Sequence, residues 1–517
     1  MRLRKTRSRV VSRWLGTGAL AATVPFALVA GTTGGGVVGA APESGHRSVS
    51  GWASGLWMGT ATGTTSTTLS SVRSIINASS GTAGTLTGQG VGVALVDTGI
   101  APVPGLPAAQ IVNGPDLSFE SQSNELRYLD TYGHGTHMAG IIVGNDTATG
   151  TKGLAPKAKL TSLKLGTSNG AVDVTQVIAA IDWIVLHRND DPANPIRVLN
   201  LSYGTGGNSA YETDPVQFAV EQAWRAGITV VVAAGNFGNN TAKLTNPATD
   251  PHVIAVGSAG SKGTTSTADD TLSTFTNLAT DFRGLDLVAP GESIVSLRDQ
   301  GSNIDEGYAT ARVGETLFKG SGTSQAAAVT SAAVALLLQN RPTLTPDQVK
   351  QVLMDSATPL KVGIGATKGI KQLNLGAALT KPATATYQPY DWSTGGGEIE
   401  TARGTSHVMR DNVALSGNST LFGPFHSATW AAYSAVQRSW IGGQWLGMRI
   451  AGDGWTGTSF ASKTWASATW PGIPWSGASS WVDPDWSGRY WAGRYWAGRY
   501  WSGRYWASDD WSTAYWG

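Results

Sequence analysis

A glycine-containing turn leads directly into an apolar segment at Gly320-Ser321-Gly322-Thr323-Ser324-Gln325-Ala326-Ala327-Ala328. The two glycines permit backbone shapes and close approaches that a side chain would block. Because residues 326–338 are apolar nearly all round, they predict a buried helix from about Gln325 to Gln339. Ser324 then stands at the first helical turn, where backbone N–H groups without intrahelical partners favour negative charge. A lone serine here is more simply interpreted as the N-cap of a core helix, so its role depends on its partners elsewhere in the chain.

The composition restricts the class of protein. With 517 residues the chain is long enough for a large domain and a second region. Its net charge of +2 argues against nucleic acid as the main partner. The absence of cysteine excludes disulfides, thiolate chemistry and cysteine-ligated zinc.

The N-terminus has the pattern of a secretory signal peptide. Residues 1–13 are rich in arginine, an apolar run follows from Trp14 to about Ala30, and small residues lead to Ala40. We expect cleavage after Ala40, which makes residues 1–40 the signal peptide. The alternative is an uncleaved membrane anchor. No later apolar run is long enough to span a bilayer, so the mature protein is expected to be soluble, exported and free of membrane contact.

Apolar runs and amphipathic segments alternate through the middle of the chain. Strands are expected at 91–97, 197–201, 228–234, 253–256 and 285–289, and helices at 173–186, 214–227 and 345–357 with Asp173, Asp214 and Thr345 at their starts. The alternation predicts an α/β domain over residues 69–380, with a central, mostly parallel sheet and helices on both faces. Residues 41–68 are interpreted as a flexible lead-in or a short propeptide.

Three residues that occur in the order Asp97, His134 and Ser324 have the chemistry of an acyl-transfer site. Asp97 ends a continuous apolar run, and alone it is explained by a strand-terminating turn; His134 lies between glycines at the start of an apolar helix. A serine hydroxyl needs a base to remove its proton, and an imidazole can do this near neutral pH. Asp97 would orient that imidazole. The backbone N–H of Ser324 and the side chain of Asn236 are the candidate donors to an oxyanion.

A zinc site built on the same histidine is not expected. His134 and His137 are three residues apart, but the stretch lacks the glutamate that the HExxH arrangement of a metalloprotease requires. His137 is therefore interpreted as a structural histidine.

Four blocks of the chain resemble those of the subtilisin-like serine proteases (subtilases). They contain Asp97-Thr-Gly, Gly-His134-Gly-Thr-His, Ala-Ala-Gly-Asn236 and Gly-Thr-Ser324-Gln, and the resemblance covers about residues 70–380. It implies a serine endopeptidase that acts on polypeptides. It also implies that Ser202, Tyr203 and Gly204 pair with an extended substrate. Ala233, Ala234 and Gly235 would form one wall of the pocket for the residue before the scissile bond.

The chain departs from many subtilases in several respects. Gln325 stands where many carry methionine, and the region before residue 69 is short for a folded pro-domain. The resemblance also implies structural Ca²⁺, for which Asn145-Asp146 is a candidate loop, but its ligand density is too low to assign a metal site. No cofactor is required by the proposed chemistry.

The C-terminal part has a different pattern. Residues 381–429 are interpreted as a linker region and residues 430–517 as a tail in which tryptophan recurs on a five-residue grid. The unit Trp-Ser/Ala-Gly-Arg-Tyr occurs four times from Trp486 to Tyr505. A period of five gives no single apolar face in a strand or helix, so repeated turns or a stacked solenoid are favoured.

The function of the tail stays open at this point. Such aromatics can stack on glycans or cell wall, which would keep the protein at the cell surface. The alternative is a sticky or removable tail without a ligand. Nucleic acid is not expected as its partner, and the sequence assigns no oligomeric state.

The sequence therefore predicts a secreted serine endopeptidase. The alternative is a non-catalytic surface adhesin that acts through the tail. The intact Asp97, His134 and Ser324 favour the enzyme.

Overall fold

The computed structural model describes residues 66–449, except for 123–125, 208, 280–282, 361–368, 385–386, 405–406, 408, 411–412, 421–422 and 442–443. The predicted signal peptide, most of the lead-in and the tail beyond residue 449 lie outside the described residues. None of the helices in the described part is long and apolar enough to cross a membrane.

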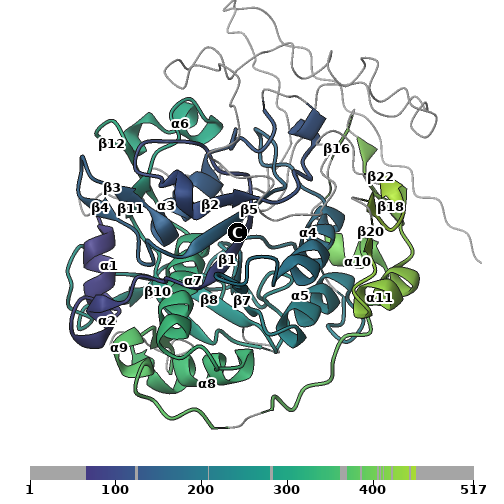
Figure 1. Ribbon diagram of the computed structural model, residues 1–517. Coiled ribbons are helices and arrows are strands. Elements are labelled where there is room, and N and C mark those ends of the chain that lie inside the picture. The colour runs from purple at the N-terminus through teal and green to yellow at the C-terminus, as the bar shows by residue number, and fades with distance from the viewer. Residues whose placement is uncertain are drawn as a thin grey trace, which may run out of the picture. The chain divides into compact units, whose positions relative to one another are not determined.

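A ten-stranded sheet forms the centre of the described chain (Figure 1). Its main path runs β14-β15-β10-β8-β7-β6-β1-β5-β2, and β9 pairs with β8 off this path. The bounds are β1 Gly92–Asp97, β2 Ile111–Asn113, β5 Lys159–Lys164, β6 Ile196–Leu201, β7 Thr229–Ala233, β8 Ile254–Gly260, β9 Thr271–Leu272, β10 Leu287–Pro290, β14 Thr358–Pro359 and β15 Lys371–Gln372. All neighbours from β2 to β15 are parallel, whereas β9 and β14 pair antiparallel. The predicted mostly parallel α/β fold is confirmed.

The helices that cover this sheet begin where local sequence signals place them. The larger ones are α3 His134–Val143, α4 Val174–His187, α5 Pro215–Arg225, α7 Thr323–Asn340 and α8 Pro346–Ser356. Asp173 and Thr345 form the capping boxes of α4 and α8, and Asp214 caps α5, as predicted. Helix α7 starts two residues earlier than expected, and it packs on β6, β7, β8 and β10 as well as on α3. In Figure 1, α3 and α7 lie on one side of the strands and α4 and α5 on the other.

Smaller elements complete the domain. They are the helices α1 Leu69–Ile75, α2 Gly81–Thr85, α6 Asn303–Gly307 and α9 Leu375–Ala378, and the strands β3 Asn145–Asp146, β4 Thr151–Lys152, β11 Ile294–Leu297, β12 Arg312–Val313 and β13 Leu317–Gly320. Strand β13 pairs antiparallel with β11 and delivers the chain to the turn before α7. This hairpin therefore fixes the approach of the backbone to Ser324.

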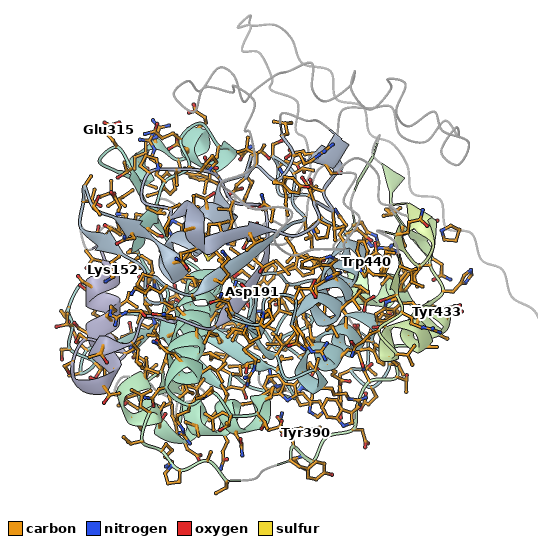
Figure 2. All side chains as sticks on the ribbon, viewed as in Figure 1. Lys152, Asp191, Glu315, Tyr390, Tyr433 and Trp440 are labelled. Atoms are coloured by element: carbon orange, nitrogen blue, oxygen red, sulfur yellow. The ribbon has the colours of Figure 1, made fainter. Side chains whose placement is uncertain are left out.

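The region after residue 381 is more ordered than a linker interpretation suggests. It contains α10 Ile399–Arg403, α11 Ser427–Ala435 and the strands β16 Met409–Arg410, β17 Val413–Ala414, β18 Ser419–Thr420, β19 Gly423–Pro424, β20 Trp440–Ile441, β21 Gln444–Trp445 and β22 Met448–Arg449. Helix α10 contacts α4 and α5, α11 contacts α5, and β20 contacts α4. Trp440, labelled in Figure 2, donates its indole N–H to the carbonyl of Ala179 in α4. The described part of residues 387–449, called the C-terminal extension below, thus packs on the α4–α5 face.

Candidate active site

Three elements end or begin together around the predicted Asp97, His134 and Ser324. Asp97 is the last residue of β1, His134 the first of α3 and Ser324 the second of α7. The carboxyl ends of parallel strands meet at one edge of a sheet, where sites form in such folds. Because α3 packs on both β1 and α7, the three residues belong to mutually contacting elements.

Asp97 and His134 form a buried pair. Asp97 Oδ1 lies 2.6 Å from His134 Nδ1, and the side chains are 1% and 0% exposed. The same carboxylate oxygen accepts the backbone N–H of Thr98 at 2.8 Å. An acceptor at Nδ1 holds a proton on that nitrogen, which leaves Nε2 as the basic nitrogen of the ring. Only glycine fits at position 135, next to the pair, because a Cβ there would lie 2.1 Å from the carbonyl oxygen of Gly99.

Asp130 supports this pair, and sequence reasoning missed it. Its Oδ1 accepts Thr98 Oγ1 at 2.8 Å and Gly133 N at 2.7 Å, and its Oδ2 accepts both N and Oγ1 of Thr136 at 2.7 Å. Burial raises the pKa of Asp130, and these hydrogen bonds oppose the rise. The available signal was an acid four residues before His134 in a turn of small residues.

His137 is buried one turn along α3. Burial, with the charge of His134 as a second cause, lowers the pKa of His137 to about 3. Its ring therefore stays neutral near pH 7. Its carbonyl accepts Ser296 Oγ from β11 at 2.8 Å, which fits the predicted structural role.

Ser324 is buried at the head of α7. Its Oγ makes no hydrogen bond to any residue between 66 and 449 that the structure describes. Catalytic hydrogen bonds are often long or unmade without substrate and tighten in complexes, so this geometry is compatible with a nucleophile. The carbonyl of Ser324 accepts Ser202 Oγ at 3.4 Å, which links the helix to the end of β6.

Asn236 has one end of its amide fixed and the other available. Its Oδ1 accepts N and Oγ1 of Thr323 at 2.9 and 3.1 Å. Its buried Nδ2 has no partner among the described residues. A Cβ on Gly322 would lie 3.4 Å from this Nδ2 and 3.7 Å from Ser324 N. The nearest atom to that Cβ would be Gln325 Oε1, at 2.7 Å, so the position beside Gly322 is bordered by the two N–H donors and by the Gln325 side chain. Two such donors side by side can stabilise a developing oxyanion.

The segments predicted to bind substrate lie at the ends of neighbouring strands. Ser202, Tyr203 and Gly204 follow β6, and Ala233, Ala234 and Gly235 end β7 or follow it. The side chain of Tyr203 is fully buried, so the backbone is the part of that residue suited to pairing with a peptide. Gly235 N donates to Thr323 Oγ1 at 3.2 Å, which brings the second segment to the head of α7.

In the Asn145-Asp146 loop, the carboxylate of Asp146 accepts hydrogen bonds from three protein donors. Asp146 accepts Ala148 N at 3.0 Å, Thr149 Oγ1 at 2.6 Å and Thr316 Oγ1 at 2.9 Å, while Asn145 is exposed. Within the described ranges no group of three or more His, Cys, Asp or Glu side chains could hold a metal ion. Asp146 thus belongs to a hydrogen-bonded turn, and calcium binding by this loop stays a prediction of the resemblance.

Known proteins are similar to just over half of this chain. Serine protease AprX of Bacillus subtilis (strain 168) is 37% identical over 286 residues, which are 54% of this chain and 63% of the relative. The extracellular serine proteinase of Thermus sp. (strain Rt41A) is 38% identical over 275 residues, 53% of this chain and 57% of that protein. Subtilisin DY of Bacillus licheniformis is 30% identical over 293 residues, 56% of this chain and 91% of its own. The chain thus spans less than two thirds of the first two relatives.

Two solved structures are also similar. A cold-adapted subtilisin-like serine proteinase aligns with a TM-score of 0.44 and 28% identity over 56% of this chain and 90% of its own. Fervidolysin from Fervidobacterium pennivorans, a keratinolytic enzyme related to subtilisin, aligns with a TM-score of 0.48 and 25% identity over 68% and 52%. The sequence profile of the subtilase family matches residues 88–381, more than half of the 517 residues. The chain therefore belongs to the subtilase family.

Proposed function

We propose that this protein is a secreted serine endopeptidase in which Ser324 is the nucleophile, His134 the general base and acid, and Asp97 the residue that orients the imidazole. The observation that carries the proposal is the buried 2.6 Å contact between Asp97 and His134 at the head of α3, the helix that packs on the serine-bearing α7. The names of the matched relatives as serine proteases support the same reaction.

The proposed reaction follows from these positions. His134 Nε2 takes the proton of Ser324 Oγ as this oxygen attacks the carbonyl carbon of the scissile bond. The negative oxygen of the tetrahedral intermediate receives hydrogen bonds from Asn236 Nδ2 and Ser324 N. His134 then protonates the leaving amine, and an acyl-enzyme remains on Ser324. Water, deprotonated by the same imidazole, attacks the acyl carbonyl and releases the second product.

The substrate is proposed to be an extended polypeptide. Its backbone would pair with residues 202–204, and the side chain before the scissile bond would face residues 233–235. Both segments are tied to the head of α7, through Ser202 and Gly235 respectively. A peptide held by both would present its carbonyl to Ser324.

Secretion and surface retention are part of the proposal. The signal-like N-terminus supports export, and two matched relatives are named extracellular. The tryptophan-rich tail is proposed to keep the enzyme at the cell surface by contact with glycan or wall polymer.

Labelling with a fluorophosphonate probe near pH 7 tests the activated serine. The full chain, a Ser324→Ala variant and a Ser331→Ala variant are compared, with intact masses of each. Ser331 is a buried serine farther along α7 that donates to Asn200 Oδ1 at 2.8 Å, so it is a matched control. We expect labelling of the wild type and Ser331→Ala only. A folded, processed wild type that takes no label would contradict the enzyme and favour the adhesin.

A further inference from the structure

We propose that the C-terminal extension is a brace for substrate binding, in which Arg403 is a positioning residue that holds the loops on both sides of Asp97. The proposal rests on the proposed function, because it concerns the binding of an extended peptide at that site. It starts from the strand order β5-β1-β6, which places the loops after β5 and β6 on either side of the end of β1.

Arg403 fixes the loop that follows β5. Its side chain is fully buried, and its Nε lies 2.6 Å from Oδ1 of Asp173, which is also fully buried. Asp173 ends the loop 165–172 and caps α4 by accepting Thr175 N. At the other end of this loop, Leu165 N donates to the carbonyl of Asp97 at 2.8 Å. The loop is therefore tied to the site at one end and to Arg403 at the other.

The remaining donors of Arg403 hold the extension together. Its Nη1 donates to the carbonyl of Gly417 at 2.7 Å and its Nη2 to the carbonyl of Ser419 at 2.6 Å. A planar guanidinium with donors on several edges can make all these contacts, whereas a lysine ammonium cannot reproduce them. Arg403 is thus the residue through which the extension contacts the capping carboxylate of α4.

Helix α10 also contacts the loop that follows β6. Thr205 Oγ1 donates to the carbonyl of Ala402 at 2.7 Å, and Ser209 Oγ donates to Thr401 Oγ1 at 2.8 Å. The two backbones are so close that a Cβ on Gly404 would lie 2.3 Å from the carbonyl oxygen of Gly206. Thr205 directly follows residues 202–204, which are proposed to pair with substrate. One short helix therefore braces both loops.

A second attachment holds the extension to the middle of α4. Asp182 accepts the indole N–H groups of Trp430 and Trp445 at 2.8 Å each, and Ser434 Oγ at 2.6 Å. This attachment lies about two and a half turns of helix from Asp173. The extension is consequently a packed part of the domain, attached to α4 at two places.

Comparison of two substrates tests the brace. The full chain is assayed with a peptide long enough to pair with residues 202–204 and with a single-residue ester that cannot. We expect Arg403→Lys to lower the ratio of kcat/KM for the peptide to that for the ester about tenfold, mainly through KM of the peptide. Thr205→Val, which keeps the side-chain volume and removes the hydrogen bonds of Thr205 Oγ1 to the carbonyl of Ala402 and from Gly207 N, should lower the same ratio by a smaller factor. If Arg403→Lys fails to fold, the ratio measured for Thr205→Val tests the brace in its place.

Arg283→Lys is the matched control. Arg283 makes a largely buried ion pair with Asp286 just before β10, with both side chains 9% exposed. The substitution should lower stability without changing the ratio, because β10 is separated from β5 and β1 in the strand order. If Arg403→Lys has a lowered Tm but keeps the wild-type ratio of the two kcat/KM values, the extension contributes only to stability and the brace is overturned. If Arg403→Lys does not fold, the same result in Thr205→Val overturns it. Failure of the proposed function looks different, since the wild type would then react with neither substrate.

Discussion

Asn236 shows how a single amide can be oriented by one end to act with the other. Thr323 donates its N–H and hydroxyl to Oδ1, so Nδ2 is left on the side of Gly322 and Ser324 N. The donor is therefore preorganised before any oxyanion forms. Preorganised donors act on the charge of the transition state, where they cost no reorganisation.

Replacement of this donor should slow the chemical step selectively. We expect Asn236→Ala to lower kcat by ~10²–10³ with little change in KM, a magnitude measured for an oxyanion-hole donor in subtilisin, a relative of this chain. Steady-state kinetics on a peptide substrate measure both constants. Asn236→Asp keeps the Oδ1 acceptor for Thr323 and should be at least as slow. A fast Asn236→Asp beside a slow Asn236→Ala would mean that the support of Thr323, and not the Nδ2 donor, is what matters.

At the scale of elements, sequence patterns predicted what short-range contacts decide. The ends of β1 and the starts of α4, α5 and α8 follow from apolar runs and from caps such as Asp173, which lie within four residues of their partners. The positions of Asp97, His134 and Ser324 at element boundaries were predictable for the same reason. The pairing of Arg403 with Asp173 was not predictable, because the two residues are 230 positions apart in the sequence and meet only through tertiary packing.

The tryptophan grid illustrates the same limit. Trp430, Trp440 and Trp445 belong to α11, β20 and β21, so no face of one element unites them. Each is nevertheless buried, and each donates its indole N–H to α4. Period analysis treats a segment as one helix or strand and cannot detect a set of anchors that approach a common helix from separate elements.

Asp182 should contribute strongly to the attachment of the extension. Burial raises the pKa of this carboxyl, and the donors Ser434, Trp445 and Trp430 oppose the rise. The indoles of Trp430 and Trp445 donate to Oδ2 and the hydroxyl of Ser434 to Oδ1, so Asp182→Asn replaces one of these two acceptors by an amide N–H donor. We expect the free energy of unfolding to fall by about 1–3 kcal/mol, the range for leaving buried donors unsatisfied. Urea unfolding measures the change.

A matched substitution elsewhere checks the origin of that loss. Asp355 is exposed near the end of α8, and Asp355→Asn should change stability by less than about 0.5 kcal/mol. Equal unfolding midpoints for Asp182→Asn and the wild type would contradict the anchoring role of Asp182.

At the scale of the whole described chain, the C-terminal extension is also held by a cluster of buried ionisable groups. Both oxygens of Glu221 in α5 lie within 2.9 Å of Ser393 N. Trp392 stacks on His252 with ring centroids 3.7 Å apart, and Arg225 lies 4.0 Å over Trp392. Figure 2 labels Tyr390, which meets His252 edge-on and precedes this contact. The first part of the extension is therefore attached to the buried carboxyl group of Glu221.

The protonation of this cluster makes stability depend on pH. Burial, with the charge of Asp250 as a second cause, raises the pKa of Glu221 to about 9. Burial raises the pKa of Asp250 to about 6, opposed by a hydrogen bond from His252 N and by the charges of Arg283 and Lys350. Burial lowers the pKa of His252 to about 4. Between about pH 4 and 6.5 the folded state binds less proton at His252 than the unfolded state does, so that group favours unfolding as the pH falls.

Above pH 6.5, Glu221 is the member of this cluster whose titration should dominate. The folded state keeps its proton up to a pKa of about 9, whereas the unfolded chain loses it near a pKa of 4.5. The folded state thus binds more protons across this window, and the free energy of unfolding falls as the pH rises. We expect a decline of roughly 1 kcal/mol per pH unit between neutral pH and about pH 8, close to the value for one proton. Above that, Lys350 opposes the decline, because burial lowers its pKa to about 8 and the folded state then loses this proton before the unfolded state does.

Glu221→Gln isolates this effect, because glutamine resembles the protonated acid and does not titrate. Urea unfolding is measured at several pH values between neutral and about 9, in a Ser324→Ala background that removes self-digestion. The decline should be much shallower in Glu221→Gln than in its parent. Glu315→Gln, an exposed residue labelled in Figure 2, should keep the parental slope. If Glu221→Gln declined as steeply as its parent, the proton held at Glu221 could not be what couples the extension to pH, and the slope would have to arise from groups outside this cluster.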